Sequence, residues 1–374
     1  RIMILVKQIH TKEEMKQFVS FPFSLYKNSK YWVPGMIKEE LKSFDLNPNI
    51  LESIKVNYFL AYQNNKVVGR IAVIINWTEV NDLNKRKVRF GWFDFIDDIE
   101  VSSALLQKAE EFAKEHQLEY VEGPMGFTNM DKAGMLTQGF DYLPTMIGLY
   151  NYEYYPKHLE KLGYKPEAEW LEFSMTMENI GKAWNMEKMA SMIEKRYQVK
   201  ALQFNSIKEV LPYVDEMFGV LNSSYSELQS YVPIQQYQID HYKEKYISFI
   251  HPDYISIIVN QDHKIVAFAI TMPSFSKAFK KANGSLFPFG WYHLLKAMKK
   301  NDHAEFYLIG IEPEYQSKGV TALIFRDFYN RFTKRGIKTV ETNPLLEENK
   351  KIQQLWKTFD PIIHKKRKTY RKDI

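Results

Sequence analysis

Hydrophobic and polar positions follow the same order of patterns in the two halves of the chain. A pair of β-favouring runs flanks Asn64-Asn65 in the first half and Gln261-Asp262-His263 in the second, and each pair predicts a hairpin. Each predicted hairpin is followed by an apolar strand, an amphipathic helix and a second short strand. These elements are expected at residues 88–95, 102–116 and 119–122, and again at residues 306–311, 319–334 and 338–342. Two copies of one strand–helix–strand unit are the simplest account of this repetition.

The remaining patterns predict elements around these two copies. Residues 2–9 indicate a first strand, and Thr11 with Glu14 forms a capping box that predicts a helix from about Lys12. Residues 222–231 and 235–246 are expected to be helical. Two aromatic segments leave alternatives open. The run in residues 21–34 either packs a helix onto a sheet or walls an acceptor cleft. The insertion at residues 273–291 is either a substrate-site element or a surface hairpin packed on its own aromatic side chains.

The stretch from Phe306 to Phe328 carries the clearest chemical signal. An apolar strand ends at Pro313, which has no amide to donate and fixes its own φ. A polar turn with Gly319 then leads into a helix. The first amides of a helix lack partners within it and point outward at the positive end of the helix dipole. Because a glycine lets a phosphate approach the backbone closely, the turn is predicted to cradle a diphosphate.

This strand, turn and helix resemble the acetyl-CoA-binding motif of the GNAT acyltransferases. In that motif a strand and a Pro precede Gln/Arg-x-x-Gly-x-Gly/Ala, which stands here as Gln316-Ser317-Lys318-Gly319-Val320-Thr321, with Thr321 in place of the final small residue. The resemblance implies acetyl-CoA or a longer acyl-CoA as cosubstrate. The residues expected to hold it are Ile309, Gly310, Ile311, Gln316, Ser317, Lys318, Gly319, Val320, Thr321 and Asn349.

The repeat as a whole resembles a tandem GNAT protein. This implies an α/β (α+β) fold with two GNAT-like domains, each a mixed, mostly antiparallel sheet flanked by helices, at residues 1–180 and 181–374. The first domain is expected to be degenerate. At its corresponding turn stands Asp97-Asp98-Ile99-Glu100, whose carboxylates suit a helix start but would repel a diphosphate. The segment from Leu25-Tyr26 to Trp32-Val33-Pro34 is also similar to one in bacterial GNAT-related proteins, some of which are long-chain N-acyltransferases of ceramide-synthase-like type.

Acyl transfer to an amine requires a polarised thioester carbonyl, a base for the amine and an acid for the departing thiolate. A backbone amide within Ile309–Ile311 is expected to polarise the carbonyl. Many GNAT enzymes supply the acid with a Tyr, but Trp356 stands at the matching position, and indole is no useful acid. The candidates that remain are Glu341, Tyr370 and Tyr307. Asn343 and Asn349 either bind the pantetheine or cap a helix, and capping is favoured for Asn343, which precedes a Pro.

Composition narrows the functional classes. The chain has 374 residues, 15% aromatic, with a net charge of +6 and no cysteine, so disulfides, thiolate nucleophiles and Cys-ligated zinc are excluded. The nine histidines show no metal-ligand spacing, and no metal is expected. No apolar run reaches the ~18 residues of a spanning helix, so we expect a cytoplasmic protein. The basic segment 364–372 is read as a solvated tail or as a contact for adenosine phosphates, RNA or an anionic membrane surface.

Together these patterns predict an N-acyltransferase of GNAT type that moves an acetyl or longer acyl group from CoA to a small-molecule or lipid amine. Two alternatives stay open. One is a non-catalytic acyl-CoA-binding module, because Thr321 and Trp356 depart from the motif. The other is a tandem-GNAT transferase that uses aminoacyl-tRNA. No RNA-binding aromatic motif accompanies the basic segment, so a nucleic-acid partner is not expected.

Overall fold

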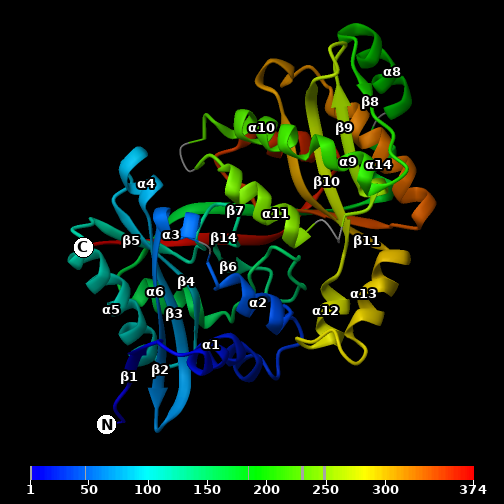
Figure 1. The fold of residues 1–374 in the computed structure, drawn as a ribbon. Coiled ribbons are helices and arrows are strands. Elements are labelled where there is room, and N and C mark those ends of the chain that lie inside the picture. Colours follow the sequence, from blue (N-terminus) through cyan, green and yellow to red (C-terminus); the bar gives the residue numbers. More distant parts are fainter. Residues whose placement is uncertain (1, 47, 184, 229–230, 247–249) are drawn as a thin grey trace. The chain divides into compact units, whose positions relative to one another are not determined.

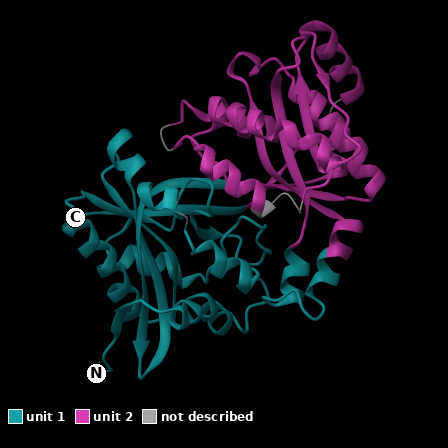
Figure 2. Cartoon of the chain, in the orientation of Figure 1, with its two compact units in different colours: residues 1–171, 276–294, 365–374 teal, residues 172–275, 295–364 magenta. Residues whose placement is uncertain are grey.

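The computed structural model describes residues 2–46, 48–183, 185–228, 231–246 and 250–374, which form two compact units. Unit 1 consists of residues 1–171, 276–294 and 365–374, and unit 2 of residues 172–275 and 295–364 (Figure 2). The predicted boundary at residue 180 stays a prediction, because compactness groups residues by packing and not by duplicated origin.

The elements of unit 1 lie mostly in the first half of the chain (Figure 1). Its strands are β1 (Leu5–Gln8), β2 (Ile54–Gln63), β3 (Lys66–Asn76), β4 (Lys87–Phe95), β5 (Tyr120–Gly123), β6 (Met135–Gln138), the first part of β7 (Lys165–Thr176) and most of β14 (Ile362–Asp373). Its helices are α1 (Lys12–Leu25), α2 (Ile37–Ser43), α3 (Pro48–Ser53), α4 (Trp77–Asp82), α5 (Ile99–Glu115), α6 (Tyr154–Lys161) and α12 (Ser276–Ala282), with the start of α13 (Gly290–Lys299).

The local patterns explain how unit 1 folds. Thr11 and Glu14 form the predicted capping box, and α1 begins at Lys12. The predicted hairpin joins β2 to β3 through Asn64 and Asn65, whose φ values of 50° and 61° are those of a tight primed turn. β4 and β5 are parallel, as expected for strands joined through a helix, here α5. In Figure 1, α5 follows β4 and precedes β5 along the chain.

A buried ionic cluster supports the sheet of unit 1. Both carboxylate oxygens of Glu79 bind Arg89, at 2.8 and 2.9 Å, and Lys87 lies 3.2 Å away. Lys87 also binds Glu122 at 2.8 Å. Burial alone would raise the pKa of Glu79, but Arg89 and Lys87 lower it to about 2. The cluster is therefore a paired, desolvated network whose members depend on one another.

The basic C-terminal segment is a strand, so its interpretation as a solvated tail is wrong. β14 lies between β5 and β7 in the strand order, and Arg367 and Tyr370 are fully buried. Arg367 donates to the backbone carbonyl of Leu149. Thr369 donates to Glu122 at 2.6 Å. Carbonyl and carboxylate groups from elsewhere in unit 1 thus pair with this basic segment, which by its sequence alone suggests a free tail.

Unit 2 contains the second copy of the repeat. Its strands are the end of β7, β8 (Lys200–Ala201), β9 (Ile255–Val259), β10 (Ile265–Pro273), β11 (His303–Ile311), β12 (Thr339–Thr342) and β13 (Leu345–Leu346). Its helices are α7 (Met177–Ala183), α8 (Met186–Tyr197), α9 (Ile207–Val210), α10 (Val214–Tyr225), α11 (Gln236–Tyr246), α14 (Thr321–Arg335) and α15 (Lys350–Lys357), with the 3-10 turns η1 (Leu211–Tyr213), η3 (Pro252–Tyr254) and η4 (Pro313–Tyr315).

The β9–β10 hairpin and the parallel β11–β12 pair joined by α14 confirm the second predicted copy. The helix predicted at residues 222–231 is misplaced. α10 begins earlier, because Val214, Met217, Phe218 and Leu221 form its buried face, and it ends at Tyr225. The insertion at residues 273–291 forms α12 and the start of α13, so the surface hairpin is wrong, while its interpretation as a substrate-site element stays a prediction.

The described strand pairs are mostly antiparallel and helices flank them, which confirms the predicted fold class. In unit 2 the apolar core lies between the sheet and α14, where Phe306, Leu323, Phe325 and Trp356 pack together. No helix among the described residues combines the length and apolar character needed to cross a membrane.

Candidate functional site

β11 and β12 separate partway along β11. Their parallel pairing runs from His303–Thr339 to Phe306–Thr342, and Asn343 N then donates to Phe306 O at 3.0 Å. Past this point β11 continues to Ile311 beside β10. The register with β10 shifts at Tyr307, which is an extra residue in the strand. A β-bulge at the point where two strands part re-aims the backbone, and such bulges are common beside active sites.

Two side chains of α10 occupy the exposed edge of β11. The Tyr225 hydroxyl donates to Ile309 O at 2.7 Å, and Ile311 N donates to Ser224 Oγ at 3.1 Å. The carbonyl and the amide that the sequence assigned to the cosubstrate are therefore engaged within the protein. A helix was expected near this site, but neither Ser224 nor Tyr225 was predicted as a site residue, although a Ser-Tyr pair at the end of a helix is a recognisable signal in the sequence.

The turn after β11 presents backbone amides outward. Ser317 and Gly319 have φ values of 65° and 77°, and α14 begins at Thr321. In the described part of the chain, the N–H groups of Ser317, Gly319, Val320 and Thr321 donate no hydrogen bond. Ser317, Lys318 and Gly319 are exposed. The turn thus offers exposed donors at Ser317 and Gly319, at the positive end of a helix of 15 residues, while Val320 and Thr321 are buried.

Gln316 ties this turn to the strand. Its Nε2 donates to Ile311 O at 3.1 Å, and its Oε1 accepts from Lys351 at 3.2 Å. Lys318 lies over the rings of Tyr197 and Tyr315. Partial burial, together with Glu314 and Glu216, raises the pKa of Glu312 on the other flank. The ammonium groups of Lys318 and Lys351 lie at this turn, where they would attract a bound anion.

The two candidate asparagines exchange their expected roles. Asn349 is the N-cap of α15, where its side chain accepts from Ile352 N, so the prediction that Asn343 is the better cap is wrong. Asn343 follows β12 at the point where the strands part. Its Oδ1 is buried and has no hydrogen-bond partner among the described residues. A buried acceptor without a donor is costly, and its position at this opening suits a ligand N–H.

Glu341 lies one residue before the strands part and is held by two histidines. Its Oε1 lies 2.7 Å from His303 Nε2, and its Oε2 lies 2.8 Å from His364 Nε2. His364 Nδ1 contacts the carbonyl oxygen of Glu172 at 3.0 Å, so Nδ1 carries a proton. Both carboxylate oxygens are engaged, which makes Glu341 better suited to orient His303 than to reach a substrate.

The other candidate residues lie apart from one another. Tyr307 is buried on β11, with its ring 6.0 Å from that of Tyr242 on α11. Tyr370 belongs to unit 1 and packs in its core, and burial raises the pKa of its hydroxyl to about 12. Trp356 lies in the core of unit 2 against Phe306 and Phe325. The three predicted catalytic residues are thus distributed over both units.

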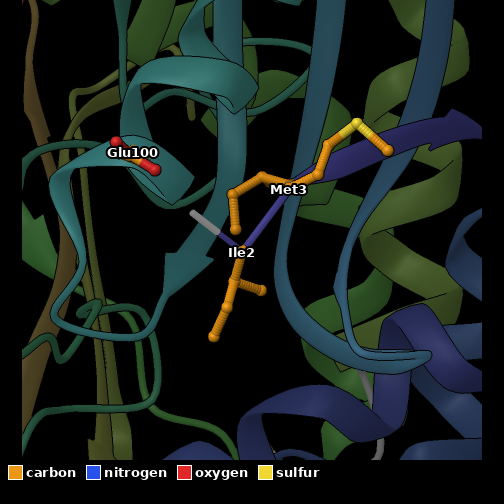
Figure 3. A pocket seen from close by; sticks show the side chains of 4 residues that line it. Ile2, Met3 and Glu100 are labelled. Carbon is orange, nitrogen blue, oxygen red and sulfur yellow. The ribbon is translucent and has the colours of Figure 1, made fainter.

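The corresponding turn of the first copy is closed by its own carboxylates. Asp98 caps α5 and accepts from Glu100 N at 2.9 Å, while Asp97 contacts His158. A hollow of about 300 Å³ beside this turn is lined by Ile2, Met3, Ile4 and Glu100. Figure 3 shows Ile2 and Met3 on the N-terminal segment and Glu100 at the helix start. This lining includes no cation, so it does not suit a phosphate.

The chain is similar to known proteins over most of its length. No protein-family model matches it. It is similar to Protein YghO of Escherichia coli (strain K12), with 26% identity over 99% of this chain and 95% of that protein. It is also similar to the bacterial ceramide synthase of Caulobacter vibrioides (strain NA1000 / CB15N), with 21% identity over 83% of this chain and 80% of that protein.

The solved structures decide the fold. The tandem GNAT protein from the clavulanic acid biosynthesis pathway matches with a TM-score of 0.59 at 9% identity, over 99% of this chain and 98% of that chain. The fold is that of a tandem GNAT protein. In this tandem GNAT fold, the β11–turn–α14 segment of unit 2 is the copy with open amides, and the β4–turn–α5 segment of unit 1 is the copy closed by Asp98.

Proposed function

We propose that the protein is an acyl-CoA-dependent N-acyltransferase and that unit 2 binds the acyl-CoA. The observation that carries this proposal is the exposed turn at Ser317 and Gly319, whose amides donate no hydrogen bond within the described residues, beside Lys318. Backbone N–H groups at the N-terminus of a helix complement the negative charge of a diphosphate. The pantetheine arm would then run along β11, where Asn343 Oδ1 provides an acceptor for one of its amides.

Acyl transfer at this place requires few protein groups. The amine attacks the thioester carbonyl, the carbon–sulfur bond breaks, one proton leaves the nitrogen and one joins the sulfur. Ile311 N is the donor best placed to polarise the carbonyl, once Ser224 Oγ releases it. We assign the proton for the thiolate to Tyr225. Burial raises the pKa of its hydroxyl, so the group is protonated at neutral pH, and it donates this proton to Ile309 O until the thiolate forms.

Glu341 has a positioning role in this proposal. His303 and His364 hold both of its oxygens, and it orients His303, whose side chain is about a quarter exposed, at 24%. Both ring nitrogens of His303 are engaged, Nε2 by Glu341 and Nδ1 by Thr339 Oγ1 at 2.7 Å, so the amine proton would pass to water. Tyr307, Tyr370 and the remaining turn residues stay candidates from the sequence. The acceptor is proposed to be a small-molecule or lipid amine, as the sequence analysis expected.

The test is release of free CoA thiol from acetyl- to palmitoyl-CoA in the presence of a panel of primary amines. The proposal expects thiol release that depends on the amine and falls strongly in Tyr225→Phe, with acyl-CoA binding retained. Ser226→Ala is the matched control, since Ser226 follows on the same helix end and bonds only locally. Absence of thiol release with every amine would contradict the proposal.

A second function is favoured by one observation. Ser224 and Tyr225 occupy the edge of β11 that an acyl-CoA would use, which suits a module that binds CoA without turnover. Titration with acyl-CoA in the absence and presence of amines separates the two functions. Binding without thiol release would favour the module.

A further inference from the structure

The loop between α12 and α13 exposes a cluster of large apolar side chains. Phe287 and Phe289 are 77% and 69% exposed, and Trp291, Tyr292 and Leu295 are each about half exposed (Figure 1, yellow). Isolated exposed apolar residues need no explanation, but a contiguous aromatic group at the tip of a projecting loop indicates an interaction surface.

The backbone of this loop satisfies its own carbonyl groups. Ser285 Oγ donates to Phe287 O at 2.9 Å, and the indole of Trp291 donates to Pro288 O at 2.9 Å. Leu286 O accepts from Trp291 N, and Phe289 O accepts from Tyr292 N. A loop that enters an apolar medium must satisfy its polar groups internally, because each unpaired group costs several kcal/mol there. This loop meets that requirement at four consecutive carbonyls, Leu286 to Phe289.

The charged residues within the insertion itself are of one sign. From Ser274 to Asn301 the sequence contains lysines and no Asp or Glu. The exposed lysines precede and follow the aromatic tip in the sequence, at Lys277 and Lys281 on α12, at Lys296 and Lys299 on α13, and at Lys300 just after α13. A cationic rim around an aromatic tip complements an anionic lipid surface, where Trp and Tyr settle at headgroup depth and Lys meets phosphate.

The opposite side of the insertion is fixed to unit 1. Ser276 Oγ donates to Pro144 O at 2.6 Å, and Ile37 N donates to Gly284 O at 3.0 Å. Lys280 donates to the carbonyls of Ser29 and Trp32. At Gly290 a Cβ would lie 2.1 Å from Ser285 O, so the turn depends on glycine. Contacts with the rest of unit 1 therefore hold the base of the loop in place.

From these observations we propose that the loop of residues 285–292 inserts into the headgroup region of an anionic membrane, with the flanking lysines bound to lipid phosphate. α13, with 10 residues, is far too short to span a bilayer of about 30 Å, so the contact is interfacial. The proposal does not depend on the acyltransferase activity, because it rests on the exposed tip, its internal hydrogen bonds and its charge.

The experiment is flotation of the full chain with phosphatidylcholine vesicles that contain or lack phosphatidylglycerol. The wild type should float with anionic vesicles, and Phe287→Ser/Phe289→Ser should weaken that binding at least about tenfold. Lys296→Gln/Lys299→Gln should weaken it by about fivefold per charge removed, and the loss should shrink at high salt. Trp291 fluorescence should shift to the blue with anionic vesicles only.

Met189→Ser/Met192→Ser is the matched control, because it removes two exposed apolar side chains from α8, which belongs to unit 2 and not to the loop. It should float like the wild type, and all variants should keep the wild-type melting temperature. Three results would each overturn the proposal: no flotation of the wild type, flotation unchanged in Phe287→Ser/Phe289→Ser, or self-association through the loop without vesicle binding.

Discussion

Gly319 offers the sharpest test of the diphosphate cradle. Gly319→Glu places a carboxylate on the turn whose amides are open. At about 5 Å from a phosphate charge, the repulsion is about 1–3 kcal/mol between the dielectric limits of water and a protein surface. The affinity for CoA should therefore fall about tenfold to a hundredfold. Isothermal titration with CoA at low salt measures the change, and added salt should reduce it.

The helix itself supplies the control. Gly336 ends α14 with a φ of 76°, which nearly equals the 77° of Gly319 at the other end. A side chain at either position costs about 1–2 kcal/mol of folding free energy from left-handed backbone strain. A new Cβ would lie 3.3 Å from Ile193 Cδ1 at Gly319, while nothing lies within 4 Å at Gly336. Gly336→Glu should therefore lose stability as Gly319→Glu does, but keep its affinity for CoA.

Gly319→Gln separates charge from bulk, since Gln and Glu have the same shape. It should bind CoA more tightly than Gly319→Glu, at equal thermal stability. If Gly319→Glu retains wild-type affinity while folded, or if Gly336→Glu loses affinity equally, the turn is not the phosphate site and the reasoning from open amides is wrong.

Three further predictions concern other residues. Ser224→Ala frees Ile311 N and should raise the affinity for acyl-CoA severalfold if the acyl arm takes that donor; unchanged affinity in titration would argue against binding along this edge. Glu79→Gln leaves Arg89 without its carboxylate and Lys87 with Glu122 alone, and it should cost about 3 kcal/mol at neutral pH. Because the pKa of Glu79 is lowered from 4.5 to about 2, urea unfolding should show this stability present above pH 4.5 and lost as the pH falls toward 2. Glu312→Gln should match the wild type below the ordinary carboxyl pKa and melt at a higher temperature above it, because the raised pKa of Glu312 marks a penalty on its charged form; equal melting temperatures at pH 7 would contradict this.

Local patterns predicted the fold well where the signals were short in range. The capping box of Thr11 and the Asn64-Asn65 turn are set by neighbouring residues, and each appears where expected. The prediction of a solvated tail at β14 was wrong, because the burial of this strand depends on distant partners such as Glu122 and the carbonyl of Leu149. A run of Lys and Arg carries no sign of such partners in the sequence alone.

The candidate site divides in the same way. The turn around Gly319 was predictable, since strand, breaker and helix follow one another in the chain. The histidines around Glu341 were not, because His303 and His364 lie on different strands and only their register brings them to one carboxylate. Tyr225 was not predicted as a site residue, because the predicted helix began too late. The last turn of the observed helix, α10, is the part that reaches Ile309.

The place of β14 in unit 1 has a consequence for synthesis. The strand is made well after β5 and β7, yet it fills the position between them. The N-terminal sheet must therefore wait, with a gap in its hydrogen bonding, until translation of this stretch is finished. A nascent chain halted before Ile362 should be protease-sensitive in its first half and should engage chaperones that shield unpaired strand edges.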